Sequence, residues 1–153
     1  MEFPEKPTTT STPRPPLPDE LKGWIGFMLK KALQELLEIF NQYLSPLGVE
    51  PRHLGVLWLL RARGPMRQVA LSEAMRLDRT TIMRLVDDLE QRGLVRRAPD
   101  PEDRRAHAVT ITSEGLRLLQ QARPLLEAAE NHFLRRLSPE ERVTLRALLE
   151  RLV

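Results

Sequence analysis

The chain has 153 residues, a formal net charge of +3 and no cysteine, a size that suits one compact domain or one domain with an arm. The missing cysteines exclude a disulfide framework, a thiolate zinc site and a thiol-based redox sensor. No apolar run approaches the roughly 20 residues of a membrane span and the N-terminus does not resemble a secretion signal, so we expect a cytoplasmic protein that binds no membrane.

The N-terminal segment, residues 1–18, contains six of the thirteen prolines and a run of Thr and Ser at 8–12. Such a composition cannot bury enough apolar surface to offset the entropy lost on ordering the chain, so we predict a flexible arm. From Asp19 to Leu47 apolar residues recur with helical spacing, which predicts a helix of about 25 residues. The apolar stripe is wider than one small domain requires. We therefore infer that part of the segment 19–49 packs against another subunit.

Two shorter helices are predicted next, separated by Gly64-Pro65. Residues 50–63 are apolar nearly all round, which is typical of a central core helix. Residues 67–76 are predicted to be the first helix of a helix-turn-helix.

The stretch from Leu77 to Gly93 predicts a helix with one buried and one exposed face. Asp78 is a good N-cap, and Leu77 and Ile82 have the spacing of a hydrophobic staple. Gly93 stands where a helix C′ residue is expected. The apolar stripe consists of Ile82, Leu85, Val86 and Leu89. The opposite face carries Thr80, Thr81, Met83, Arg84 and Asp87.

Residues 94–98 and 107–112 are candidate strands, joined by the polar loop 99–106, which carries Arg104 and Arg105 at or near its tip.

Positive charge is concentrated in this part of the chain. Residues 52–105 hold 12 Lys or Arg and 8 Asp or Glu, which leaves the remainder with a net charge of −1. A genome that favours arginine would explain much of the arginine count, but it would not explain why the positive charge lies in this segment. A basic segment favours contact with nucleic acid.

The C-terminal segment, residues 113–153, predicts two helices. Thr112 or Ser113 caps a long one that runs to Leu137, and Pro124 in its interior should kink it. A capping box with proline at N1, Ser138-Pro139-Glu140-Glu141, opens the last helix. The terminal helices together present more apolar surface than the domain 50–112 can cover. The expected fold is mainly α with a small β-wing (α+β).

Several short motifs follow one another in a fixed order between residues 43 and 122. They are Leu47-Gly48-Val49, Gly64-Pro65, the run Asp78–Glu90, Arg92-Gly93-Leu94-Val95, Asp100–Arg105 and Thr112-Ser113-Glu114-Gly115. With this spacing the sequence resembles the winged helix-turn-helix domain of the MarR family of transcriptional regulators. The resemblance implies that segments 19–49 and 113–153 are dimerisation helices flanking a DNA-binding domain, 50–112.

The sequence departs from the family pattern at two positions. Arg76 stands where the family usually has a turn glycine, and Ser72 replaces a usual alanine. A non-glycine residue with a positive φ is uncommon. The turn at Arg76 therefore either avoids a positive φ or tolerates its strain.

If residues 79–92 form a recognition helix, its N-terminal half would enter the major groove. Arg84 could bond guanine O6 and N7, and Met83 could touch a thymine methyl group. The hydroxyls of Thr80 and Thr81 could reach bases or phosphates, and Arg79 is expected to contact phosphate. The alternative is an ordinary solvated helix face.

For the hairpin, the resemblance implies that Arg105 enters the adjacent minor groove and that Asp103 holds it in place, with Arg104 beside it. Narrow A·T-rich minor grooves concentrate negative potential and attract arginine. The alternative is a charged hairpin tip without a partner.

The three histidines, His53, His107 and His132, are far apart in the sequence and none has metal-ligand spacing. No catalytic triad, phosphate loop or acid pair appears. We expect no enzyme, no metal and no cofactor. The resemblance implies a small aromatic or phenolic effector, bound where the dimerisation helices meet the winged domain. The candidate lining residues, each of which could instead be simple core packing, are Trp24, Met28, His53 and Trp58.

These observations predict a homodimeric, sequence-specific transcriptional regulator, a repressor, that binds double-stranded DNA at a pseudo-palindromic operator and responds to an effector. The alternative is a winged-helix interaction module that binds protein or nucleic acid without sequence specificity. That module would show only salt-sensitive binding to nucleic acid, whereas a regulator would protect an operator-sized footprint.

Overall fold

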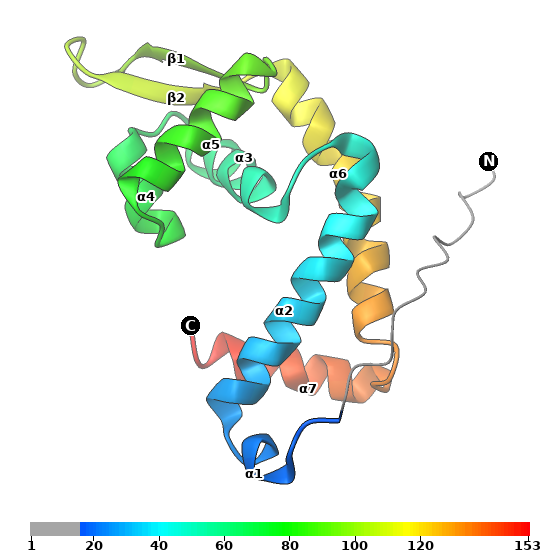
Figure 1. Cartoon of the computed structure of the whole chain (residues 1–153). Helices are drawn as coiled ribbons and strands as arrows, with labels where there is room; N and C mark the ends of the chain where they lie inside the picture. The colour runs from blue at the N-terminus through cyan, green and yellow to red at the C-terminus, as the bar shows by residue number, and fades with distance from the viewer. Residues whose placement is uncertain (1–15) are drawn as a thin grey trace, which may run out of the picture. The chain divides into compact units, whose positions relative to one another are not determined.

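The computed structural model describes residues 16–153, so most of the predicted arm, residues 1–18, lies outside the described part. The described residues divide into two units, residues 16–33 and 34–153. The elements in chain order (Figure 1) are α1 Asp19–Lys22, α2 Ile25–Leu44, the 3-10 helix η1 Ser45–Leu47, α3 Pro51–Arg63, α4 Gln68–Met75, α5 Arg79–Gln91, β1 Val95–Pro99, β2 His107–Ile111, α6 Ser113–Phe133 and α7 Pro139–Glu150. This confirms a mainly helical chain with a small two-stranded wing. Within residues 16–153, no helix has the length and apolar character needed to cross a membrane.

The prediction of one uninterrupted N-terminal helix is wrong. The helix breaks after Lys22, at Gly23 and Trp24, and then resumes as α2. Glycine costs about 1 kcal/mol relative to alanine in a helix interior, which favours an interruption at this position. At the other end α2 stops at Leu44 and tightens into η1, which Gly48 closes with a φ of 62°.

The core of the second unit surrounds α3, which is buried on several sides as its composition predicts. Leu54, Val56, Leu57 and Leu60 of this helix are each at most 2% exposed. They pack with the apolar stripe of α5 and with Leu119 and Ala122 of α6. The core thus fixes the positions of the two helices that border the wing.

The turn between α4 and α5 accounts for both departures from the family pattern. Arg76 adopts a left-handed conformation, with φ 52° and ψ 40°, which costs a non-glycine residue roughly 1–2 kcal/mol. Ser72 holds the same turn, because its hydroxyl donates to the carbonyl oxygen of Leu77 at 2.5 Å. The Leu77 amide donates in return to the Ser72 carbonyl oxygen at 3.1 Å. The turn therefore keeps the positive φ and tolerates its strain.

The wing is an antiparallel ribbon in which Arg97 of β1 lies opposite Val109 of β2. Both outer edges of the ribbon form hydrogen bonds to neighbouring elements at this pair of residues. On the β2 side, Val109 exchanges two backbone hydrogen bonds with Met66, at 2.8 and 3.0 Å. On the β1 side, the Arg97 amide donates to Oε1 of Glu90 in α5 at 2.9 Å. The ribbon is therefore held between the start of α4 and the end of α5.

The C-terminal helices follow the predicted capping signals. Thr112 caps α6, its hydroxyl accepting from the Gly115 amide, and Pro124 lies inside the helix. The helix ends at Phe133, four residues before the predicted end, because the chain then turns through backbone bonds such as Leu137 N–H to Leu134 carbonyl. The predicted capping box between Ser138 and Glu141 opens α7.

Gly115 should be intolerant of any side chain. A Cβ added there would overlap the Leu94 carbonyl oxygen and lie 2.8 Å from Cγ1 of Ile111. We expect Gly115→Ala to lower the free energy of unfolding by about 2–3 kcal/mol, measured by chemical denaturation. Gly26→Ala is the matched control, since a Cβ there meets nothing within 4 Å and alanine favours the helix. Equal losses in the two variants would contradict this account.

Candidate nucleic-acid interface

The N-terminus of α5 is held by Asp78. Its carboxylate accepts from the Thr81 amide at 2.9 Å and from the Thr81 hydroxyl at 2.6 Å. The Thr81 side-chain hydrogen bond is the largest influence that lowers the pKa of Asp78. Thr81 is half-buried and its hydroxyl proton is engaged, so only its lone pairs are available to another partner.

The remaining predicted contact residues of α5 share one exposed face. Arg79, Thr80, Met83 and Arg84 are all exposed, and Met83 has 48% of its surface accessible. The opposite stripe is fully buried at Ile82, Val86 and Leu89. The helix is thus anchored by one side and presents a hydroxyl, a thioether and two guanidinium groups on the other.

The wing loop carries Arg104 and Arg105, both exposed, between the two strands. Oδ1 of Asp103 accepts a hydrogen bond from the Arg105 backbone amide at 3.1 Å. Asp103 thus contacts the backbone of Arg105, and its support of the Arg105 side chain stays a prediction. The DNA-facing role of the two arginines stays a prediction.

Sequence reasoning missed Asp100, which organises this loop. Its Oδ1 accepts from the amides of Glu102 and Asp103 at 2.8 and 3.3 Å, and its Oδ2 accepts from Nε of Arg67 at 2.5 Å. The Arg67 hydrogen bond is the largest influence that lowers the pKa of Asp100. The Asp-Pro step was a usable signal, because aspartate in turns characteristically accepts from the amide two residues on.

Sequence reasoning also missed Arg97, which joins the wing to α5. Its guanidinium donates to Asp87 at 2.5 Å and to Oε2 of Glu90, and its own amide donates to Oε1 of the same glutamate. Asp87 was assigned to the exposed face of α5, yet it is half-buried and paired. A guanidinium bound by two carboxylates has little rotational freedom, so Arg97 fixes the ribbon against the helix.

The four candidate effector residues belong to different units of the chain, two to each. Trp24 and Met28 belong to the first unit, where Trp24 is 72% exposed. In the second unit, His53 lines a polar cavity beside Arg84 and Asp88. Trp58 lines a separate apolar cavity between α3 and α6.

His53 has structural partners on both ring nitrogens. Nδ1 accepts from the Glu50 amide at 3.1 Å, which assigns the proton of the neutral ring to Nε2, 3.2 Å from Oδ2 of Asp88. Burial is the main cause of its lowered pKa, and Asp88 opposes that shift. Among residues 16–153 no group of three or more His, Cys, Asp or Glu side chains is arranged to hold a metal ion.

The buried face of α5, its exposed basic face and the attached ribbon define a winged helix-turn-helix. The model of the MarR family matches residues 49–107. The HTH-type transcriptional repressor NicR of Pseudomonas putida is 32% identical over 149 residues, which cover 97% of this chain and 94% of NicR. The chain therefore belongs to the MarR family of transcriptional regulators, which are not enzymes.

Solved structures agree with this assignment. A mutant of Escherichia coli MarR complexed with operator DNA superimposes with a TM-score of 0.76 at 27% identity, covering 84% of this chain and 93% of that one. BpsR of Bordetella bronchiseptica, whose DNA binding is regulated by 6-hydroxynicotinic acid, gives a TM-score of 0.76 at 29% identity, covering 84% and 92%. The expected family and fold are thus confirmed.

The bond between Glu90 and Arg97 should make stability depend on pH. The Arg97 amide is the main cause that lowers the pKa of Glu90 below its ordinary value of 4.5. A depressed carboxylate pKa stabilises the folded state above the ordinary value, and this contribution is lost as the pH falls through the folded-state pKa. We expect Glu90→Gln to have a lower melting temperature than the wild type at pH 7, with the difference shrinking toward about pH 3. A difference independent of pH would contradict this prediction.

Proposed function

We propose that this protein is a homodimeric transcriptional repressor that reads a pseudo-palindromic operator. The observation that carries the proposal is the exposed face of α5, with Thr80, Met83 and Arg84 held in register by a buried stripe and by the Asp78 cap. A face of hydroxyl, thioether and guanidinium groups matches the donors, acceptors and methyl groups of the major groove. NicR, named a repressor, supports the direction of regulation.

In this proposal each α5 inserts its N-terminal half into a major groove. Arg84 hydrogen-bonds a guanine edge, Met83 packs on a thymine methyl group, and Arg79 pairs with a phosphate. The ribbon extends beside the recognition helix (Figure 1), and its arginine Arg105 enters the neighbouring minor groove. Two helices related by a two-fold axis meet half-sites roughly 34 Å apart, one turn of the duplex.

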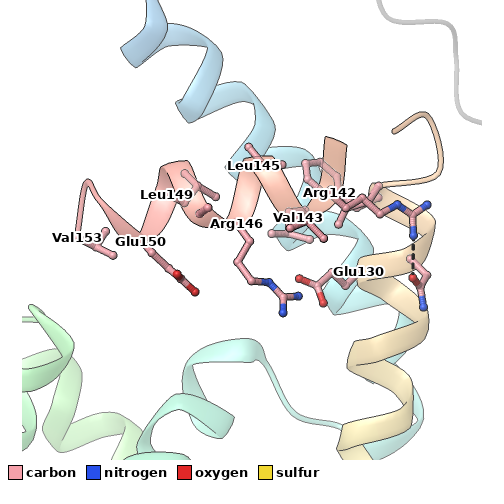
Figure 2. Close-up of a pocket in the computed structure, with 13 residues that line it drawn as sticks. Glu130, Arg142, Val143, Leu145, Arg146, Leu149, Glu150 and Val153 are labelled. Atoms are coloured by element: carbon pink, nitrogen blue, oxygen red, sulfur yellow. Dashed lines mark hydrogen bonds between the residues drawn. The ribbon is translucent and has the colours of Figure 1, made fainter. Parts of the chain in front are cut away.

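The apolar surface along the C-terminal helix is an argument for dimerisation. A largely apolar groove of about 600 Å³ opens between α7 and the end of α6, and Figure 2 shows Val143, Leu145 and Leu149 of α7 along it. Exposure of large apolar residues continues at Leu148 and Leu152, with 51% and 70% of their surfaces accessible. Contiguous apolar surface of this kind favours an interface. In this proposal a second copy of the chain covers it.

The cavity between α3 and α6 is the better candidate for an effector site. It has a volume of about 550 Å³ and its apolar lining includes Phe40, Trp58 and Leu126, with Arg123 among the polar residues. The polar lining also includes Glu130 and Glu127, and Glu127 pairs with Arg123 at 3.0 Å. The aromatic walls suit a small aromatic ligand. The regulation of BpsR by 6-hydroxynicotinic acid supports this class of ligand. An effector that prefers a dimer with the wrong spacing of recognition helices would lower operator affinity.

The test is footprinting of the purified full-length protein on its own promoter region and on duplexes recovered from a random pool, with excess nonspecific DNA. We expect a protected pseudo-palindrome of operator size. Salt-sensitive binding without a preferred sequence would instead indicate the interaction module. The protected duplex then serves to assay aromatic acids for release of DNA.

Arg105→Ala should weaken operator binding about tenfold or more, because it removes an arginine from a groove of concentrated negative potential. Arg117→Ala is the control: it removes the same charge from an exposed position on α6, where Arg117 pairs with Glu114, and should change affinity less than about twofold. Fluorescence anisotropy titration of the protected duplex measures both. Equal losses would contradict the role of the wing.

Leu149→Arg should convert the dimer to monomers, because it places a charge in the apolar groove beside α7. Loss of two-site binding should reduce operator affinity by about a hundredfold or more. Thr144→Arg introduces the same residue on α7 at an exposed position outside the groove lining and should leave both properties unchanged. Light scattering after gel filtration measures the assembly state. A dimeric Leu149→Arg variant would contradict this interface.

A further inference from the structure

The wing loop contains one buried carboxylate among exposed residues. Asp100 is 8% exposed, whereas residues 101–105 that follow it are all exposed. The two amides that its Oδ1 accepts come from Glu102 and Asp103, so the carboxylate closes the loop on itself. A buried carboxylate is costly unless a positive group compensates its charge.

Arg67 supplies that compensation from outside the wing. Its Nε donates to Oδ2 of Asp100 at 2.5 Å, and its Nη2 lies 3.7 Å from Asp103. Arg67 is the N-cap residue of α4, 33 positions away in the chain. The residue before it, Met66, is fixed to β2 by the two backbone bonds with Val109. The tip of the wing is thus tied to the first helix of the helix-turn-helix.

We propose that Arg67 is a positioning residue for DNA binding, which acts through Asp100 to hold the wing tip so that Arg105 is presented at a fixed place relative to α5. The path is short: Arg67 binds Asp100, Asp100 binds the Asp103 amide, and the Asp103 carboxylate binds the Arg105 amide. A tip held in this way is ordered before DNA arrives, which improves affinity by removing an ordering cost from the binding step. This inference rests on the proposed operator binding.

A direct contact between Arg67 and phosphate is the competing role. The side chain of Arg67 is 46% exposed, and it stands at the start of the helix that crosses the DNA backbone in this class of motif. The two roles predict opposite changes in DNA affinity for the Asp100→Asn variant. Asparagine keeps an oxygen for the two loop amides but removes a negative charge. If electrostatics alone mattered, binding would tighten; if Arg67 positions the wing, binding weakens.

The experiment measures the affinity of the full-length protein for the duplex protected in the footprint, at fixed salt, after circular dichroism has established that each variant is folded. We expect Arg67→Gln and Asp100→Asn each to weaken DNA binding about tenfold. When Arg105→Ala is already present, each should change the affinity less than about twofold, because the effects of coupled residues are not additive. Glu102→Gln is the matched control. It removes the same charge from the same loop. Glu102 is hydrogen-bonded to Asp100 through its backbone amide, which the substitution keeps, so this variant should not weaken binding.

Several outcomes would overturn the proposal. Tighter binding by Asp100→Asn, or an unchanged loss for Arg67→Gln in the Arg105→Ala background, would assign Arg67 to a direct phosphate contact. Weakening by a general loss of fold would also persist in that background and would count against the proposal. If Asp100→Asn does not fold, the cycle between Arg67→Gln and Arg105→Ala decides the question alone. Failure of the wild type to protect any duplex would reject operator binding itself.

Discussion

The structure depends on the contacts between residues 93–94 and 112–115. These residues join the end of α5 to β1 and the end of β2 to α6. The Thr112 hydroxyl donates to the Gly93 carbonyl at 2.7 Å and accepts from the Gly115 amide, while the Thr112 amide donates to the Leu94 carbonyl at 3.1 Å. Only a glycine fits against that same Leu94 carbonyl. The ends of α5, the ribbon and α6 therefore share one set of bonds, so none of the three can change direction without disturbing the others.

The ribbon shows how a small sheet can be made rigid enough to serve as part of a binding surface. An isolated two-stranded hairpin is marginally stable in water, and its open edges can pair with other chains. Here Met66 pairs with the β2 edge and Glu90 receives the free amide of the β1 edge, both at the level where Arg97 faces Val109. The ribbon is held by residues of the helix-turn-helix, so the two parts of the proposed DNA-binding surface are joined to each other.

Local signals in the sequence predicted most of the fold, whereas the supports of the candidate site depended on long-range contacts. Asp78 and Ser138 were assigned correctly because a cap acts within one helical turn. Arg67 could not be paired with Asp100 from the sequence, because nothing in local spacing brings together residues 33 positions apart. His53 and Trp58 line different cavities because they are five residues apart on α3, which rotates them about 140° from each other.

Pro124 gives α6 a mechanical property that its length alone would not suggest. Before the proline, Leu118, Leu119 and Ala122 are buried; beyond it, Glu130, Asn131 and Phe133 border the groove of α7. Proline has no amide proton, so the carbonyl of Gln120 loses its intrahelical donor at this point. The helix lacks one backbone hydrogen bond at this point, which makes it easier to bend between its buried N-terminal half and the half that borders the groove.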